Sequence, residues 1–136
     1  KDIGITLEDT LAVCESLVSK SIEGLHISCW DVFEKHTSGK TLTKEISQFL
    51  GQRIPIISTG SVWTGGDAQF LLEEGANGVG VARVSLPFPD WPLSSGSVDY
   101  SPSKPPFTPG DLIGAELSPI FVDYMRRWKG FVTDGK

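Results

Sequence analysis

The stretch from Pro55 to Pro92 constrains the fold of this chain more than any other part of it. It starts with a short apolar run, passes through a glycine-containing turn into a helix, and returns to a second apolar run that ends before a lone arginine, Arg83. Strands that alternate with helices predict right-handed crossovers and a parallel sheet. Such a layout can hold a phosphate group between two adjacent strand ends.

The residues before this stretch follow the same alternation of helix and strand. The expected elements are a helix from Leu7 to about Lys20, a strand at residues 25–30, a loop at 31–40, a helix at 42–50 ended by Gly51, a strand at 54–59, a helix at 65–74 after Thr64, and a strand at 78–82. Thr6 and Asp9 are spaced as in a capping box. The run at 54–59 is almost wholly apolar, which predicts a strand buried on both faces.

Composition limits the class of protein and its partners. With 136 residues and 39% hydrophobic residues, the chain is long enough for a compact soluble domain. Its net charge of −5 argues against nucleic acid and anionic membranes as partners. The start of the chain shows no signal peptide, and Cys14 and Cys29 are expected to be buried or half-buried free thiols, so a cytoplasmic location is expected.

Proline divides the chain into three expected parts. Seven of the nine prolines lie between Leu86 and Pro109, which predicts a wandering segment without helices. The expected organisation is a partial α/β domain at residues 1–92, a Pro/Ser-rich connecting segment at 93–117, and a C-terminal helix and tail at 118–136. Ser118 and Pro119 are expected to start that helix, with Ile120, Tyr124 and Trp128 lining one face as far as Gly130.

The candidate site consists of Gly60 and Ser61 after one strand and Ala82 and Arg83 after the next. If the two strands are parallel neighbours, these residues lie side by side. Gly60 would let an anion approach the main chain, and Arg83 would add a charge-assisted contact. In the alternative interpretation, Gly60 only turns the chain and Arg83 pairs with a surface carboxylate. The pattern alone leaves both open.

Four stretches resemble the C-terminal part of the old yellow enzyme family, the FMN-dependent NADH:flavin oxidoreductases, and most closely its bacterial NADH-dependent branch. These are GITLEDTLAVCESLVSKSIEGLHIS, PIISTGS, DAQFLLEEGANGVGVAR and PDWP, which begin at Gly4, Pro55, Asp67 and Pro89. The resemblance implies the segment of a (β/α)₈ barrel that holds roughly strands six to eight. It implies that Gly60, Ser61, Ala82 and Arg83 hold the FMN phosphate, with Ala82 where the family has glycine.

The resemblance also implies what this chain lacks. A complete barrel needs about 250 residues and eight strands. The family's catalytic residues belong to earlier strands and have no matching position here, so no catalytic residue is assigned. In the complete protein, NADH or NADPH would be the reductant and a small molecule the acceptor. The chain alone is expected to be inactive.

Two alternatives to this function remain open. The chain could be an inactive fragment that self-associates as a homo-oligomer through the open edges of its sheet. It could also be part of another phosphate-binding TIM barrel, in which Arg83 would serve a different ligand.

Several other residues have a functional and a structural interpretation. His26 could approach the flavin or substrate, but a structural, hydrogen-bonded histidine is favoured. Trp30 and Trp63 could edge a ligand pocket, but packing in a core or at a rim is favoured. The residues of one polar loop could bind a metal, but a solvated loop is favoured because their spacing matches no compact site: Asp31, Glu34 and His36.

Overall fold

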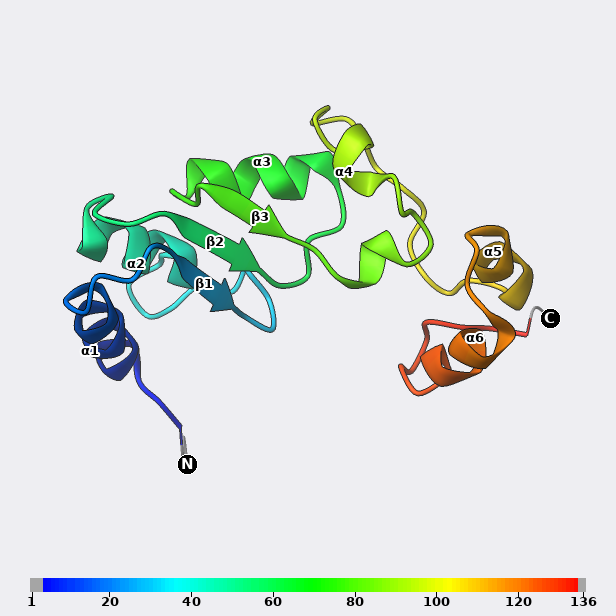
Figure 1. Cartoon of the computed structure of the whole chain (residues 1–136), viewed down its shortest axis with the longest axis horizontal. Coiled ribbons are helices and arrows are strands. Elements are labelled where there is room, and N and C mark those ends of the chain that lie inside the picture. The colour runs from blue at the N-terminus through cyan, green and yellow to red at the C-terminus, as the bar shows by residue number, and fades with distance from the viewer. Residues whose placement is uncertain (1–3, 135–136) are drawn as a thin grey trace. The chain divides into compact units, whose positions relative to one another are not determined.

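A computed structural model describes residues 4–134 and shows a mixed α/β protein (Figure 1). Its elements in chain order are α1 (Leu7–Val18), β1 (Leu25–Ser28), α2 (Leu42–Leu50), β2 (Ile56–Thr59), α3 (Gly65–Glu73), β3 (Gly78–Gly80), the 3₁₀ helix η1 (Arg83–Ser85), α4 (Trp91–Ser94), α5 (Pro109–Gly114) and α6 (Pro119–Met125). The predicted alternation of helix and strand up to β3 is confirmed. The strands are shorter than predicted, and β3 ends at Gly80 rather than Ala82.

The ends of the first two helices are set by local capping. The Thr6 hydroxyl accepts a hydrogen bond from the Asp9 amide and the Asp9 carboxylate accepts one from the Thr6 amide, which is the predicted capping box. The second helix ends at Gly51, which has a left-handed φ of 57° and donates its amide to the Ser47 carbonyl. These short-range contacts explain why the sequence predicted both helices well.

The three strands form one parallel sheet in the order β1-β2-β3. The register pairs His26 with Ile57 and Ser28 with Thr59 between β1 and β2, and Thr59 with Gly80 between β2 and β3. All three strands therefore point the same way, and their carboxyl ends lie at one edge of the sheet. The predicted parallel sheet is confirmed.

The two faces of this sheet differ sharply in burial. One face carries Ile27, Ile56 and Ser58, which are all buried and lie against the helices. The other face carries His26, which is exposed, and Ile57, whose side chain is 46% exposed. The prediction that residues 54–59 form a strand buried on both faces is wrong, because the helices cover only one face.

The covered face and its helices form the first core. It joins Cys14 of α1, Ile27 of β1, Ile46 and Leu50 of α2, and Ile56 of β2. A buried hydrogen bond of 2.8 Å between the hydroxyl groups of Thr43 and Ser58 also joins α2 to β2. Burial of polar hydroxyls in this core is tolerated because each is the other's partner.

The chain divides into two compact units. The first comprises residues 4–62 and 67–81, and the second comprises residues 63–66 and 82–134. The second unit has its own core of aliphatic and aromatic side chains: Phe107, Leu112, Val122, Met125 and Phe131, with Trp63, Leu86, Phe88, Leu117 and Val132 packed against them. The aromatic cluster in this core consists of Phe107 and the rings in contact with it, Trp63, Phe88 and Phe131. The predicted three-part division of the chain stays a prediction.

Helices in the second unit depart from the predictions. A single helical turn, α4, lies inside the proline-rich segment, so the prediction that no helix forms there is wrong. Its Trp91 is buried and donates its indole N–H to the Trp63 carbonyl at 2.8 Å. The helix α5 was not predicted; Thr108 and Asp111 form a second capping box at its start. The Thr-Pro-Gly-Asp sequence at residues 108–111 is typical of the start of a capped helix, so α5 could have been predicted.

The last helix begins as predicted and ends early. Ser118 caps it and Pro119 is its first residue, but it stops at Met125 instead of continuing to Gly130. Its buried side chains are Val122 and Met125, whereas Ile120 is 84% exposed. The predicted apolar face is therefore wrong, because packing against the aromatic cluster chooses a different stripe.

No helix in residues 4–134 combines the length and the apolar character required to cross a bilayer.

Candidate functional site

The turn after β2 contains the first two residues of the predicted site. Gly60 has a φ of 151°, a backbone conformation that favours glycine. A side chain at this position would collide with the backbone carbonyl of Cys29. The glycine is thus required because two main-chain segments pass close to each other at the ends of β1 and β2. Its role is to shape the turn.

Ser61 has a left-handed φ of 55°, which is uncommon outside glycine. Its hydroxyl donates a hydrogen bond of 2.9 Å to the carbonyl of Trp30. Its backbone amide donates to no other group of the described chain, and the residue is exposed. The main-chain N–H of Ser61, rather than its side chain, is therefore the donor that this turn offers to an anion.

The other two residues of the predicted site follow β3. Ala82 and Arg83 lie beyond the strand, at the start of η1, and both are exposed. The amide and hydroxyl of Ser85 both donate to the Ala82 carbonyl, at 3.1 and 2.7 Å. Among residues 4–134, no carboxylate forms an ion pair with the Arg83 guanidinium. Within this part of the chain its charge is therefore available to an anion.

The structure brings Gly60 and Ser61 together at the carboxyl edge of the sheet, where β2 and β3 are neighbours. Ala82 and Arg83 belong to the second unit, directly after the end of the first in the chain. That all four residues meet around one phosphate stays a prediction.

His26 lies on the open face of the sheet. Its Nε2 is 2.8 Å from the Thr59 hydroxyl oxygen, so the favoured interpretation of a hydrogen-bonded histidine is confirmed. Thr59 immediately precedes Gly60 and was not singled out from the sequence. A readable signal was present, since a single threonine closes an apolar run directly before the glycine turn.

The two tryptophans after strand ends have different environments. Trp30 is 91% exposed, so the prediction that it packs in a core or rim is wrong. Trp63 does pack: its ring stacks against Phe107 with centroids 6.3 Å apart, and its indole N–H donates to the carbonyls of Pro102 and Ser103.

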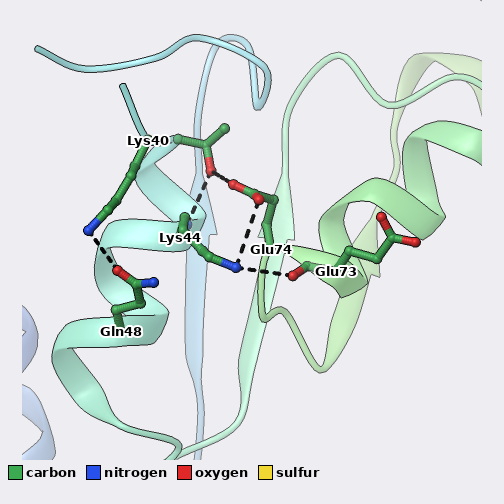
Figure 2. A network of polar contacts seen from close by, with 6 residues as sticks. Lys40, Lys44, Gln48, Glu73 and Glu74 are labelled. Carbon is green, nitrogen blue, oxygen red and sulfur yellow. Dashed lines mark hydrogen bonds and ion pairs between the residues drawn. The ribbon is translucent and has the colours of Figure 1, made fainter. Parts of the chain in front are cut away.

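A polar network joins the start of α2 to the end of α3 (Figure 2). The buried Thr41 hydroxyl donates to the Glu74 carboxylate at 2.6 Å, and the Lys44 ammonium donates to the Glu73 carbonyl at 3.3 Å. Lys40, which precedes α2, donates to Gln48 of that helix at 2.8 Å. Because these groups use one another as partners, the network is structural, and its contacts from Thr41 and Lys44 to Glu73 and Glu74 hold the two helices together.

The two cysteines are free thiols, one buried and one half-buried, as predicted. Burial raises the pKa of the Cys14 thiol. Burial, followed by the negative charges of Asp31 and Glu34, raises the pKa of the Cys29 thiol. Both side chains are therefore held in the protonated form, which is a poor nucleophile.

Asp31, Glu34 and His36 are not gathered around a common point. Among residues 4–134, no three side chains of His, Cys, Asp or Glu lie close enough to hold a metal ion.

An open depression of about 480 Å³ lies in the second unit. Its lining includes the carboxylates of Asp90, Asp111 and Glu116. Negative side chains at this place oppose the binding of a phosphate group, so the depression does not compete with the strand ends as a phosphate site.

No family model matches the sequence. A comparison with curated proteins finds a protein of Bacillus subtilis (strain 168) named "Probable NADH-dependent flavin oxidoreductase YqiG", which is 30% identical over 92 residues. The match covers 65% of this chain and 25% of the Bacillus protein. The chain thus spans about a quarter of the length of this distant relative.

Proposed function

We propose that this chain is part of an FMN-dependent NAD(P)H oxidoreductase of old yellow enzyme type and that it supplies the grip on the flavin phosphate. The proposal rests on the arrangement of residues at the carboxyl edge of the sheet. There, the turn after β2 exposes the Ser61 amide beside the end of β3, and the chain continues directly to Arg83, which has no ion pair among the described residues. The name of the Bacillus relative supports a flavin as the ligand.

The one-sided sheet supports a barrel origin. In a (β/α)₈ barrel, helices cover the outer face of a parallel sheet and the inner face packs against the other strands. Here the helices cover one face, and the face that bears His26 and Ile57 is open. We propose that β1, β2 and β3 are the sixth, seventh and eighth strands, with the open face turned toward the barrel interior.

The residues present fit a phosphate group. A main-chain N–H at Ser61 and a guanidinium at Arg83 are donors of the kind that bind phosphate oxygens, and the Arg83 charge offsets that of the anion. The exposed methyl group of Ala82 leaves its own amide able to donate. When bound, FMN supplies the hydride chemistry between NADH or NADPH and a small-molecule acceptor. In this chain we assign binding residues and no catalytic residue.

The test is a titration of the purified 136-residue chain with FMN and with riboflavin, which lacks the phosphate, followed by quenching of flavin fluorescence. The wild-type chain should bind FMN more tightly than riboflavin. Arg83→Ala should weaken FMN binding about tenfold or more, the loss expected when a charge-assisted contact is removed, and leave riboflavin binding unchanged. Lys129→Ala, which removes the same charge at a distant position in the sequence, is the matched control.

The possible results separate the candidate functions. Equal binding of FMN and riboflavin would overturn the proposed phosphate grip. Binding of inorganic phosphate that depends on Arg83, without any binding of flavin, would instead favour another phosphate-binding barrel.

The free sheet edges favour a second candidate, in which the chain is an inactive fragment that self-associates. In the described sheet β1 and β3 are the outer strands, and each has one side without a neighbouring strand. Such edges pair readily with another chain. Sedimentation over a range of protein concentrations tests this candidate: a dimer that lacks flavin binding would support it, and a monomer would exclude it.

A further inference from the structure

A row of three residues crosses the open face of the sheet, one from each strand. The ring of His26 on β1 lies 2.8 Å from the hydroxyl of Thr59 on β2, measured from Nε2 to Oγ1. Thr59 is paired in register with Gly80 on β3. A side chain at Gly80 would collide with the Thr59 hydroxyl, so the threonine side chain lies directly over this glycine. Thr59 is thus hydrogen-bonded to β1 and lies over a position of β3 that has no side chain.

Thr59 is also the residue from which the turn begins. Its carbonyl accepts the Cys29 amide at 2.8 Å, and the following Gly60 packs closely against the Cys29 carbonyl. One residue further, the Ser61 hydroxyl is tied to the Trp30 carbonyl. The turn is therefore built against the end of β1, and its geometry depends on how β1 and β2 are held together at this edge.

The His26–Thr59 hydrogen bond is the side-chain tie between these two strands on the open face. In the described part of the chain, no other side-chain hydrogen bond joins β1 to β2. Ser61 is held at a left-handed φ, a conformation that a serine keeps only where its surroundings determine it. A tie placed one residue before this turn is in the right position to maintain it.

We propose that His26 is a positioning residue of the phosphate site. Through Thr59, it holds the Gly60–Ser61 turn in the shape that presents the Ser61 amide to a phosphate oxygen. The inference rests on the proposed function and adds a residue to it that has no contact with the phosphate. Gly80 contributes to the same arrangement as His26 and Thr59, because it leaves the space in which the Thr59 side chain lies.

The test compares variants that remove the tie with variants that keep it. Thr59→Val removes the hydroxyl without changing the shape of the side chain, and His26→Leu removes the ring nitrogen. Thr59→Ser and His26→Gln each retain a group that can form the hydrogen bond. Ser28→Ala, on the same strand and the same exposed face as His26, is the control.

Two measurements separate positioning from general stability. The first is the ratio of riboflavin to FMN dissociation constants, which isolates the grip on the phosphate. The variants without the tie should lower this ratio about fivefold, the typical effect of one hydrogen bond, while riboflavin affinity stays constant. The second is the NMR shift of the Ser61 amide on addition of inorganic phosphate, which should be reduced in the same variants. The variants that keep the tie, and the control, should behave as the wild type.

The outcomes distinguish this inference from the function on which it rests. If the wild type prefers FMN and both variants without the tie keep that preference, His26 has only a structural role and the inference is wrong. If the wild type does not prefer FMN, the proposed function fails and the inference fails with it. Should Thr59→Val not fold, His26→Leu against His26→Gln decides the question, because this pair alters only an exposed ring.

Discussion

Ile56 and Ile57 are adjacent, chemically identical and in the same strand, yet their environments are opposite. Ile56 is 2% exposed and lies among the side chains of the first core, whereas Ile57 is 46% exposed on the open face. Successive residues of a strand point to opposite faces, so the contrast follows directly from the pleat once a single face is covered. The difference shows that the helices of this unit cover one face of the sheet and leave Ile57 on the other face partly in water.

The two faces also differ in chemistry. The covered face holds apolar side chains and one paired hydroxyl, Ser58, while the open face holds His26, Ser28 and Thr59 beside Ile57. A stable soluble unit tolerates an open face of this kind more readily when it is partly polar. Under the proposed function, the same polar groups lie near the phosphate end of the barrel interior.

The largest expected effect comes from truncating one isoleucine of this pair. Ile56→Ala should lower the free energy of unfolding by about 2–4 kcal/mol, because it opens a cavity in a closely packed core. Ile57→Ala should cost less than about 1 kcal/mol, because much of its side chain is already in water. Urea unfolding of both variants measures the difference. Equal losses would break the comparison and show that the open face is covered in solution.

The buried hydroxyl pair gives a smaller effect on the covered face. Thr43→Val removes one partner and leaves the Ser58 hydroxyl buried and unsatisfied, which should cost about 1–3 kcal/mol. The double replacement Thr43→Val with Ser58→Ala should recover part of that loss, since no polar group is then left unpaired. Ser28→Ala on the open face is the control and should change stability little. A double variant no more stable than Thr43→Val would contradict this account.

The smallest expected effect is a loss of folding stability at acid pH, and it comes from the capping box of α1. This helix places Cys14 in the core on the covered face. The Thr6 amide and then its hydroxyl donate to Asp9 and hold the pKa of that carboxyl below its usual value. Because the folded-state pKa is the lower one, the stabilisation is complete above the unfolded pKa of about 4 and is lost as pH falls through the folded pKa.

Thermal unfolding at a series of pH values measures this contribution, and Asp9→Asn is the comparison. The variant should lose less stability than the wild type as pH falls below about 4, and Cys14 should react faster with a thiol reagent at neutral pH because the helix end is loosened. Asp111 in the second capping box should behave like Asp9, since the Thr108 amide and hydroxyl lower its pKa in the same way. An unchanged pH profile in Asp9→Asn would count against the role of the cap.

The parts of the fold that the sequence predicted depend on interactions between residues that are close together in the chain. The helix at residues 42–50 is confirmed at both ends, because Thr41 and Gly51 act on groups only a few residues away. The parallel order of the strands followed from their alternation with helices. In the candidate site, Gly60 was identified as a residue where the main chain is closely approached, but the group that approaches it is the Cys29 carbonyl.

The parts that were missed depend on distant contacts. Nothing near Trp91 or Phe107 in the chain shows that they are buried, since their partners include Trp63 and Phe131. The apolar stripe of the last helix was misassigned for the same reason. The position of Thr59 before the glycine turn was visible in the sequence, but its hydrogen bond to His26, 33 residues earlier in the chain, was not.

By itself, the sequence determined where α1 and α2 begin, where α2 ends, that the strands are parallel, and that a glycine turn follows β2. These features follow from capping groups, glycine φ angles and apolar periodicity, which all act within a few residues. Only the tertiary structure decided that one face of the sheet is left open, that His26 reaches Thr59, and that an aromatic cluster forms around Phe107. Those outcomes depend on the packing of residues far apart in the chain, which no local pattern encodes.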